Sequence, residues 1–426
     1  PARVPMAAVA QPGDARGRGL APRCIIAVDI DYCYAQVHEV DEPHLRGQPL
    51  AVTQKYLVVT CNYAARARGV TKLMATAEAR RKCPELALRC GEDLTRYRAA
   101  SKGVEAVVSG FGPTERLGMD EFLVDATRRA REMAAGEWPP QWVGHVHLAA
   151  DGTCTAEELA GEKRAYRPMD LRATTSGAGG RYFDLRGAQP GSSRAGLGGG
   201  VPQAGADGAD GERGAFGDEE GGASAPAADP DAETALLMHG TAIAEELRRA
   251  VRAATGLTVS AGVAGSPLAA KLASGLHKPD AQTALPGPQV PAFLAPLPVR
   301  ALPGVGMKVE RALSQHLGVA TVAGLRARSA SDVRRALAQG GVKPGMMSAA
   351  RLLGMAVGDD PTPVRPRGPP ASLSVEDSFK GCATRARLAE GVEGLAPHLA
   401  RRLEEDAQET RRRAELLVVK WRTLGR

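Results

Sequence analysis

The sequence has neither a membrane-length apolar run nor a closely spaced pair of cysteines. No stretch approaches the roughly 20 consecutive apolar residues that a transmembrane helix requires. The seven cysteines are odd in number and scattered along the chain, and none of them forms a CxxC motif. This usage argues against a zinc site and favours a reducing compartment.

One long segment lacks lysine and regular apolar spacing. Lysine is absent from Arg164 to Ala270, and glycine recurs every few residues between Gly177 and Gly222. Such a composition buries too little apolar surface to offset its ordering entropy. We therefore expect a disordered insertion over about 153–231, in which only Tyr182 to Leu185 can order locally. Residues 1–21 are rich in Ala, Pro, Gly and Arg and are expected to form a disordered leader.

Charge is spread unevenly along the chain, whose formal net charge is +7. Between Gly205 and Glu233 there are nine acidic residues and one basic residue, Arg213, a local net charge of −8 that leaves +15 for the remainder. A folded part this basic is suited to a polyanion, of which nucleic acid is the commonest. Ordinary solubility charge is an equally good explanation of the charge alone.

Apolar periodicity elsewhere predicts a mixture of strands and helices. Strands are predicted at 24–31, 56–60, 257–266, 372–379 and 415–422, with two short strands around a turn within 115–127. Helices are predicted at 77–82, 93–108, 235–256, 267–279 and 384–412, with a small helical unit over 299–357.

Carboxylates stand at the ends of two predicted strands. The apolar run CIIAV ends in Asp29 and Asp31, and a second strand begins at Met119-Asp120-Glu121. Adjacent strand side chains face opposite ways, so Asp120 and Glu121 can share a site only at a turn or bulge, which Gly118 permits. With Asp29 they supply oxygen ligands for divalent cations, two of which can clamp a phosphoryl displacement. The alternative is a surface Asp-Glu pair on a hairpin. Asp31 has no ligand role in either case and is expected to make a structural hydrogen bond.

Basic and glycine-rich segments offer contacts to phosphate. Tyr63 and Arg66, in CNYAARARGV, share one face if this segment is helical, and Arg suits bidentate phosphate contact. Lys271 follows a glycine-containing loop that opens a helix, an arrangement suited to an anion. Solvated basic side chains are the alternative in both places.

The turn Leu302–Gly306, LPGVG, resembles the centre of a helix-hairpin-helix motif. Its backbone N–H groups could hold a nucleic-acid phosphate without reading sequence. A plain helical hairpin is the alternative.

Taken together, five segments resemble the Y-family of translesion DNA polymerases and occur in that family's order. They are VDIDYCYAQV, CNYAARARGV, ERLGMDEFLVD, SAGVAGSPLAAKLASGLHKP and LPGVG. The resemblance covers about 22–150 and 234–426. Within the family, TQKYLVVTCNYAAR, KLMATAEARRKCPEL, GEDLTRYR and SLSVEDSFKGC are most similar to the iota branch.

The resemblance implies an α+β fold with the right-hand architecture of a polymerase. Its parts would be a palm, small fingers, a helical thumb with a helix-hairpin-helix, and a partial little finger. The implied boundaries are 22–32 and 94–283 for the palm, 33–93 for the fingers, 284–365 for the thumb, 366–371 for a linker, and 372–426 for a truncated little finger.

The resemblance also assigns roles to individual residues. Asp29, Asp120, Glu121 and the carbonyl of Ile30 would hold two Mg²⁺ ions, with Mn²⁺ as an alternative, and the three carboxylates would be catalytic. Tyr34 would block a ribose 2′-OH. The remaining assignments are triphosphate contacts by Thr60, Tyr63, Arg66, Lys72 and Lys271, a nascent base pair lined by Gln54, Leu57 and Val59, and DNA phosphates at Gly304 and Gly306.

The implied activity is low-fidelity, template-directed DNA synthesis past lesions, from dNTP to a primer 3′-OH. The implied partners are primer–template DNA and dNTP, with a replication clamp or ubiquitinated proteins engaged through segments outside this sequence. A nuclear location and no membrane partner are expected. Two alternatives stay open: a catalytically idle DNA-binding scaffold, and an eta-like or kappa-like member of the same family.

Overall fold

The computed structural model describes residues 21–136, 140–148, 181–184, 232–343, 345–377 and 384–419. The predicted leader, apart from its last residue, and the predicted insertion, apart from a strand at Arg181–Asp184, lie outside the described residues. That strand overlaps the segment predicted to order locally, Tyr182 to Leu185. The chain divides into two compact units, Pro1–Arg365 and Pro366–Arg426.

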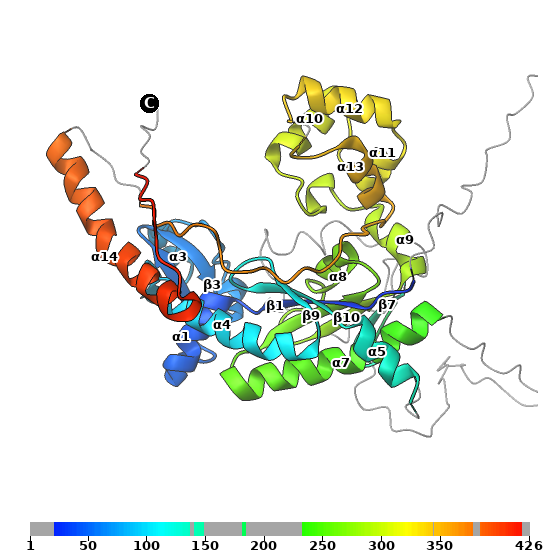
Figure 1. Cartoon of the computed structure of the whole chain (residues 1–426), viewed down its shortest axis with the longest axis horizontal. Helices are drawn as coiled ribbons and strands as arrows, with labels where there is room; N and C mark the ends of the chain where they lie inside the picture. Colours follow the sequence, from blue (N-terminus) through cyan, green and yellow to red (C-terminus); the bar gives the residue numbers. More distant parts are fainter. Residues whose placement is uncertain are drawn as a thin grey trace, which may run out of the picture. The chain divides into compact units, whose positions relative to one another are not determined.

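A seven-stranded mixed sheet is the centre of the first unit (Figure 1). Its strand order is β5-β6-β1-β9-β10-β7-β8. The strands are β1 (Ile25–Ile30), β5 (Thr114–Arg116), β6 (Glu121–Asp125), β7 (His145–Leu148), β8 (Arg181–Asp184), β9 (Val259–Ala264) and β10 (Gln282–Leu285). β1 is antiparallel to both β6 and β9, and β10 is parallel to β9 and β7. The predicted hairpin within 115–127 is therefore confirmed as β5 and β6.

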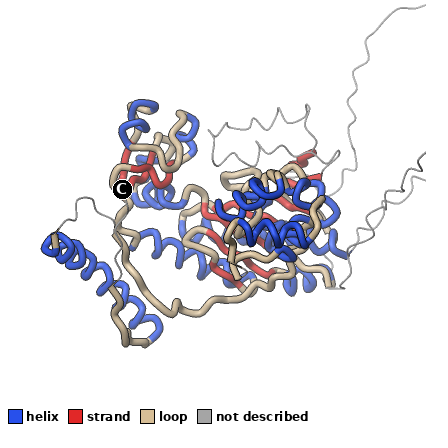
Figure 2. The backbone as a smooth tube through the Cα atoms, turned by 90° about the horizontal axis from the view of Figure 1, so that it is seen from above, coloured by secondary structure: helices blue, strands red, loops and turns tan. Residues whose placement is uncertain are grey.

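Helices pack on both faces of this sheet (Figures 1 and 2). One face carries α4 (Thr95–Val108), α5 (Thr127–Ala134) and α7 (Ala232–Thr255), and the other carries α8 (Pro267–Ala273). The predicted helices at 93–108 and 235–256 are confirmed. α8 ends at Ala273 and is therefore shorter than the helix predicted at 267–279. Gly275, a poor helix former, follows two residues later.

The alternation of β1 side chains divides the core in two. Ile26, Val28 and Ile30 join the cluster under α4 and α7, whereas Ile25 and Ala27 join the cluster under α8. Asp29 continues the second series, so its side chain belongs to the α8 face of the sheet. α8 lies close to that face, because a Cβ at position 262 in β9 would collide with the carbonyl oxygen of Ala270.

A smaller three-stranded sheet has the order β3-β2-β4. It is formed by β2 (Leu50–Gln54), β3 (Leu57–Cys61) and β4 (Ala87–Cys90), which pack with α2 (Tyr63–Ala67) and α3 (Thr76–Lys82) around a separate core. α1 (Cys33–Asp41) and η1 (Pro43–Leu45) connect β1 to it. The predicted strand at 56–60 and helix at 77–82 are confirmed.

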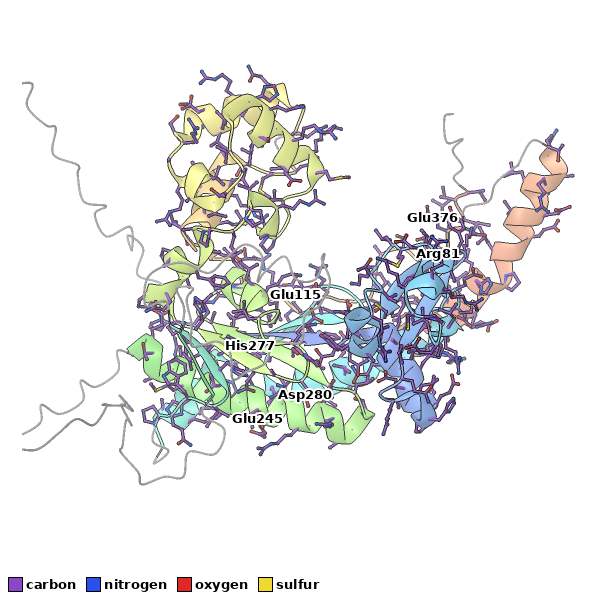
Figure 3. The ribbon with its side chains drawn as sticks, turned by 180° about the vertical axis from the view of Figure 1, so that it is seen from behind. Arg81, Glu115, Glu245, His277, Asp280 and Glu376 are labelled. Carbon is purple, nitrogen blue, oxygen red and sulfur yellow. The ribbon has the colours of Figure 1, made fainter. Side chains whose placement is uncertain are left out.

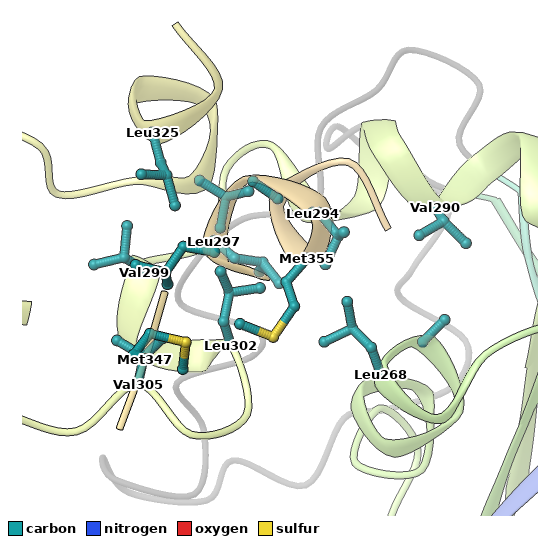
Figure 4. Close-up of a cluster of buried hydrophobic side chains, with 14 of the residues drawn as sticks. Leu268, Val290, Leu294, Leu297, Val299, Leu302, Val305, Leu325, Met347 and Met355 are labelled. Atoms are coloured by element: carbon teal, nitrogen blue, oxygen red, sulfur yellow. The ribbon is translucent and has the colours of Figure 1, made fainter. Parts of the chain in front are cut away.

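A helical unit follows the large sheet and shares the apolar cluster of α8, where Leu268 packs with Val290 and Leu294 (Figure 4). It contains η4 (Gly287–Gln289), α9 (Val290–Leu294), η5 (Val299–Ala301), α10 (Met307–Leu317), α11 (Val322–Arg326), α12 (Ala330–Gln339) and α13 (Ala349–Ala356). The predicted helical unit is thus confirmed. The LPGVG turn joins η5, a short 3-10 helix, to α10.

The second unit has α14 (Arg385–Thr410) as its regular element within the described residues. The predicted helix at 384–412 is confirmed, but the strands predicted at 372–379 and 415–422 are wrong over the described residues 372–377 and 415–419. A strand needs a neighbour for its backbone hydrogen bonds, and no paired strand occurs in the described part of this unit. β-branched composition alone does not supply that neighbour.

Across the described ranges, no helix combines the length and apolar character needed to cross a bilayer.

Candidate active site

The sheet brings Asp29 to Asp120 and Glu121, although Asp29 precedes them by 91 and 92 positions in the chain. Antiparallel pairing of β1 with β6 places Asp29 directly opposite Glu121. Asp120 ends the turn before β6, and its carbonyl accepts a hydrogen bond of 2.8 Å from the N–H of Ile30. Directly opposed residues of paired strands share one face, so Asp29 and Glu121 both belong to the α8 side.

Burial and the neighbouring negative charges raise the pKa values of two carboxylates in this cluster. Burial is the main cause that raises the pKa of Asp29 to about 6; Lys278 opposes it, while Asp120 and Glu121 add to it. Burial, followed by the Glu121 charge, also raises the pKa of Asp120. The three carboxylates therefore repel one another in a partly desolvated place, which is the electrostatic condition that a bound cation relieves.

Two lysines face these carboxylates. Lys271 Nζ, on α8, lies 2.5 Å from Glu121 Oε2, and both side chains are about one third exposed. Lys278 Nζ contacts Asp29 Oδ1, and this lysine side chain is only 9% exposed. Within the described ranges no three Asp, Glu, His or Cys side chains are arranged as ligands around one point, since Asp29 and Glu121 are each directed at a lysine.

The sequence analysis missed Lys278. It named Lys271 but gave no role to the lysine seven residues later, in the HKP end of the same segment. The helix predicted over 267–279 would put both lysines on one face, but α8 ends at Ala273. Lys278 therefore meets Asp29 from the segment before β10, a contact that local spacing does not indicate.

Asp31 has the structural role predicted for it. Its carboxylate is fully buried and accepts hydrogen bonds from Ser260 Oγ at 2.7 Å, from Thr258 Oγ1 at 3.0 Å and from the N–H of Asp280 at 2.8 Å. These donors satisfy the buried charge.

Tyr34 is the second residue of α1 and follows Asp29 by five residues in the chain. Its ring stacks on Tyr97 of α4, with a centroid distance of 4.1 Å and an interplanar angle of 10°. Tyr97 is fully buried, and its hydroxyl pairs with His38 Nε2 at 2.9 Å. The Tyr34 ring therefore rests on a fixed surface.

The predicted phosphate-contacting residues of the small sheet lie on β3, on α2 and in the loop after α2. Asn62 caps α2 by accepting the N–H of Ala65, which explains why the helix begins at Tyr63. The Arg66 guanidinium lies 4.8 Å from the centroid of the Tyr63 ring. Thr60 is buried on β3, whereas Lys72 is exposed and its charge acts to lower the pKa of Asp120. Lys72 is thus electrostatically coupled to the carboxylates.

The remaining predicted residues fall in two places. Gln54 and Leu57 are paired at the β2–β3 turn, with Val59 next on β3, and Gln54 donates to the Gly91 carbonyl at 2.8 Å. Gly304 and Gly306 are exposed in the LPGVG turn of the helical unit, apart from the carboxylate cluster. Gly304 has φ +82°, a left-handed conformation that favours glycine.

Comparisons with known proteins agree with the motifs. The model of the impB/mucB/samB family matches residues 28–275, more than half of the chain. DNA polymerase iota of Homo sapiens is 32% identical over 91% of this chain and 42% of its own length. DNA polymerase IV of Stenotrophomonas maltophilia (strain K279a) is 27% identical over 88% of this chain and 72% of its own length.

A solved structure titled "Dbh Ternary Complex (substrates partially disordered)" aligns with a TM-score of 0.49 and 18% identity, over 80% of this chain and 68% of that one. The chain spans less than half the length of the iota relatives that it matches. The family match covers β6, β9, α8 and the end of β1 from Val28, and so includes the three carboxylates and Lys271. The chain belongs to the impB/mucB/samB family, and the Y-family resemblance predicted from its motifs is confirmed.

Proposed function

We propose that this chain is an iota-like, low-fidelity, template-directed DNA polymerase for translesion synthesis. The primer 3′-OH would attack the α-phosphate of a dNTP, with pyrophosphate as the leaving group. The observation that carries the proposal is the β1–β6 register, which sets Asp29 opposite Glu121 with Asp120 in the adjoining turn. The same face offers Lys271 and Lys278 to a triphosphate.

The donor set fits hard divalent cations. Three carboxylates and the Ile30 carbonyl are oxygen ligands, and the pKa values of Asp29 and Asp120 are raised mainly by burial, with the neighbouring carboxylates adding to it. Two Mg²⁺ ions, or Mn²⁺, would be held by Asp29, Ile30, Asp120 and Glu121. When bound, such ions supply charge neutralisation at the attacking and leaving oxygens.

The surrounding residues would orient the nucleotide. Thr60, Tyr63, Arg66, Lys72, Lys271 and Lys278 would bind the triphosphate. The fixed ring of Tyr34 would exclude a ribose 2′-OH, which supports its role as a sugar gate. Gln54, Leu57 and Val59, paired or adjacent on β2 and β3, would line the nascent base pair.

We assign the parts of the hand accordingly. The large sheet would be the palm (22–32 and 94–283), the small sheet the fingers (33–93), the helical unit the thumb (284–365), 366–371 a linker, and 372–426 part of a little finger. Gly304 and Gly306 would hold DNA phosphates as part of a helix-hairpin-helix. The chain would act in the nucleus, with a replication clamp or ubiquitinated proteins as further partners.

Primer extension across the four template bases tests the function. With Mg²⁺ or Mn²⁺, the purified chain is expected to insert accurately opposite template A and to misinsert G opposite template T. The resemblance to iota-like enzymes implies both results, the first through a syn template purine and Hoogsteen pairing. Equal, accurate use of A and T would instead indicate an eta-like or kappa-like enzyme.

One observation favours a catalytically idle DNA-binding scaffold as the second candidate. In the described part of residues 366–419 no strand forms, so the little-finger part of the DNA grip is incomplete there. Primer–template binding in a gel shift, together with no incorporation at any concentration of either metal, would favour this candidate and rule out the polymerase.

The kcat/KM for incorporation is expected to fall as pH decreases through about 6. Burial is the main cause that raises the pKa of Asp29 from 3.8 to about 6, and protonation removes a cation ligand. The same shift stabilises the fold below pH 3.8, and that contribution is lost as pH rises through about 6.

A pH profile of kcat/KM reports the groups of the free enzyme and checks this prediction. Lys278 lowers the pKa of Asp29, so Lys278→Met is expected to move the acidic limb to higher pH. A flat profile down to about pH 5 in both proteins would refute this assignment of Asp29.

A further inference from the structure

The segment that carries Lys278 is held on both sides. It runs from the end of α8 to the start of β10, and its residues His277 and Asp280 are labelled in Figure 3 together with Glu245 of α7. His277 Nδ1 pairs with Thr283 Oγ1 at 2.8 Å, and its ring stacks on His145 at a centroid distance of 4.0 Å. These two contacts fix His277, the residue that precedes Lys278.

On the other side, Arg248 of α7 grips Asp280. Its Nη2 donates to the backbone carbonyl of Asp280 and, at 2.7 Å, to the Asp280 carboxylate. Its Nε donates to the Val259 carbonyl at 3.1 Å, and its Nη1 pairs with Glu245 at 2.8 Å. One buried guanidinium, 8% exposed, therefore ties α7 and β9 to the Lys278 segment.

Asp31 completes the attachment from β1. It accepts the N–H of Asp280 at 2.8 Å, while Arg248 binds the carbonyl and the carboxylate of the same residue. Asp280 is thereby held through its N–H, its C=O and its side chain. Because Asp31 stands two residues after Asp29, the anchor of the segment and the carboxylate that Lys278 contacts belong to the same stretch of chain.

Burying the Arg248 guanidinium and fixing the Lys278 side chain both cost free energy, and a contribution to folding stability does not explain why both occur here. A buried guanidinium gains little net stability over apolar packing, because its desolvation offsets the ion pairs. A free lysine side chain also loses rotamer freedom when it is fixed. A segment held at three points confines the Lys278 ammonium before substrate arrives, which is the condition that makes an electrostatic contact efficient.

We propose that Arg248, acting through Asp280, is a positioning residue that sets Lys278 for contact with the nucleotide. Arg248 reaches no carboxylate of the cluster itself; its described partners are Glu245, Val259, Asp280 and Gln282. Its effect on the reaction therefore passes through Lys278. This inference rests on the proposed polymerase function and assigns one remote arginine to it.

A double-mutant cycle on kcat/KM for dTTP opposite template A tests the inference. Arg248→Gln is expected to lower kcat/KM about tenfold, mainly through KM, which corresponds to a loss of about 1.4 kcal/mol. In the Lys278→Ala background the same change is expected to have less than about a twofold effect. An equal loss in both backgrounds would mean that Arg248 acts through general stability, and would overturn the inference.

A matched control lies next to Arg248 on α7. Arg249 is 79% exposed and pairs with Glu245 at 3.0 Å, so Arg249→Gln removes an arginine and an ion pair without touching Asp280. It is expected to leave kcat/KM within about twofold in both backgrounds. A loss equal to that of Arg248→Gln would also overturn the inference, since the effect would then follow from charge on α7.

If Arg248→Gln does not fold by circular dichroism and thermal melting, Asp280→Asn replaces it in the cycle. This change keeps the N–H and C=O of residue 280 and weakens its carboxylate contacts to Arg248 and to the exposed Arg252. Dependence of its effect on Lys278 supports the inference, and independence rejects it. If the unsubstituted chain incorporates no nucleotide, the proposed polymerase function is refuted before the cycle is measured. This result differs from every outcome of the cycle.

Discussion

Replacement of Asp120 and Glu121 together by alanine is expected to abolish nucleotide incorporation, with a loss of at least about 10³-fold in kcat. Both residues adjoin Asp29 through the β1–β6 pairing and the Ile30 N–H bond to the Asp120 carbonyl. Their removal leaves one carboxylate where three would share two cations. Metal coordination supplies several kcal/mol of transition-state stabilisation, and each 1.4 kcal/mol is about tenfold in rate.

Single-turnover primer extension measures this loss, and gel-shift binding of primer–template DNA should remain. The matched control removes two carboxylates elsewhere: Glu132→Ala with Glu246→Ala, whose side chains are 58% and 59% exposed. The control is expected to retain full activity, because exposed ion pairs contribute little. Full activity in the Asp120/Glu121 double variant would remove these residues from the catalytic site.

Tyr34→Ala is expected to raise the ratio of rNTP to dNTP incorporation by roughly 10- to 100-fold, mainly by improving rNTP use. The Tyr34 ring is stacked on buried Tyr97 and cannot retreat without breaking that contact, so a 2′-OH meets a fixed surface. A forced overlap costs about 1–3 kcal/mol, which sets the size of the expected change.

The conservative partner of this experiment is Tyr34→Phe. It keeps the ring and the stack on Tyr97, so its rNTP to dNTP ratio is expected to stay within about threefold of the unsubstituted chain. Parallel measurement of both nucleotide types on one primer–template separates selectivity from general damage. An unchanged ratio in Tyr34→Ala, with dNTP use intact, would show that another residue reads the sugar.

The family match explains why the motifs were informative. Each motif is a short segment in which residue type and spacing strongly favour one local structure. Examples are an apolar strand ending in Asp29, a turn at Gly118, and a glycine-containing loop before Lys271. These rules depend on neighbours in the chain, so they are readable without a fold. The predicted structural role of Asp31 is confirmed for a different reason: a buried carboxylate must be satisfied by donors, wherever in the chain they come from.

The errors concern contacts between distant segments. The predicted strands at 372–379 and 415–422 have suitable side chains, but strand formation depends on a partner that composition does not specify. Lys278 was missed because its significance lies in facing Asp29, 249 positions earlier. The grip of Arg248 on Asp280 likewise connects α7 to the segment before β10 and leaves no trace in local periodicity.

Sequence alone indicated the family, many of the described helices and strands, and the candidate carboxylates, Lys271 and aromatic residues, because these follow from residue type and local spacing. Tertiary structure decided which of them meet. The register of β1 against β6 sets Asp29 opposite Glu121, and the parity of β1 directs Asp29 to the face of α8. Registers and faces are set by the packing of the whole sheet, where one residue of slip would send every side chain to the opposite side.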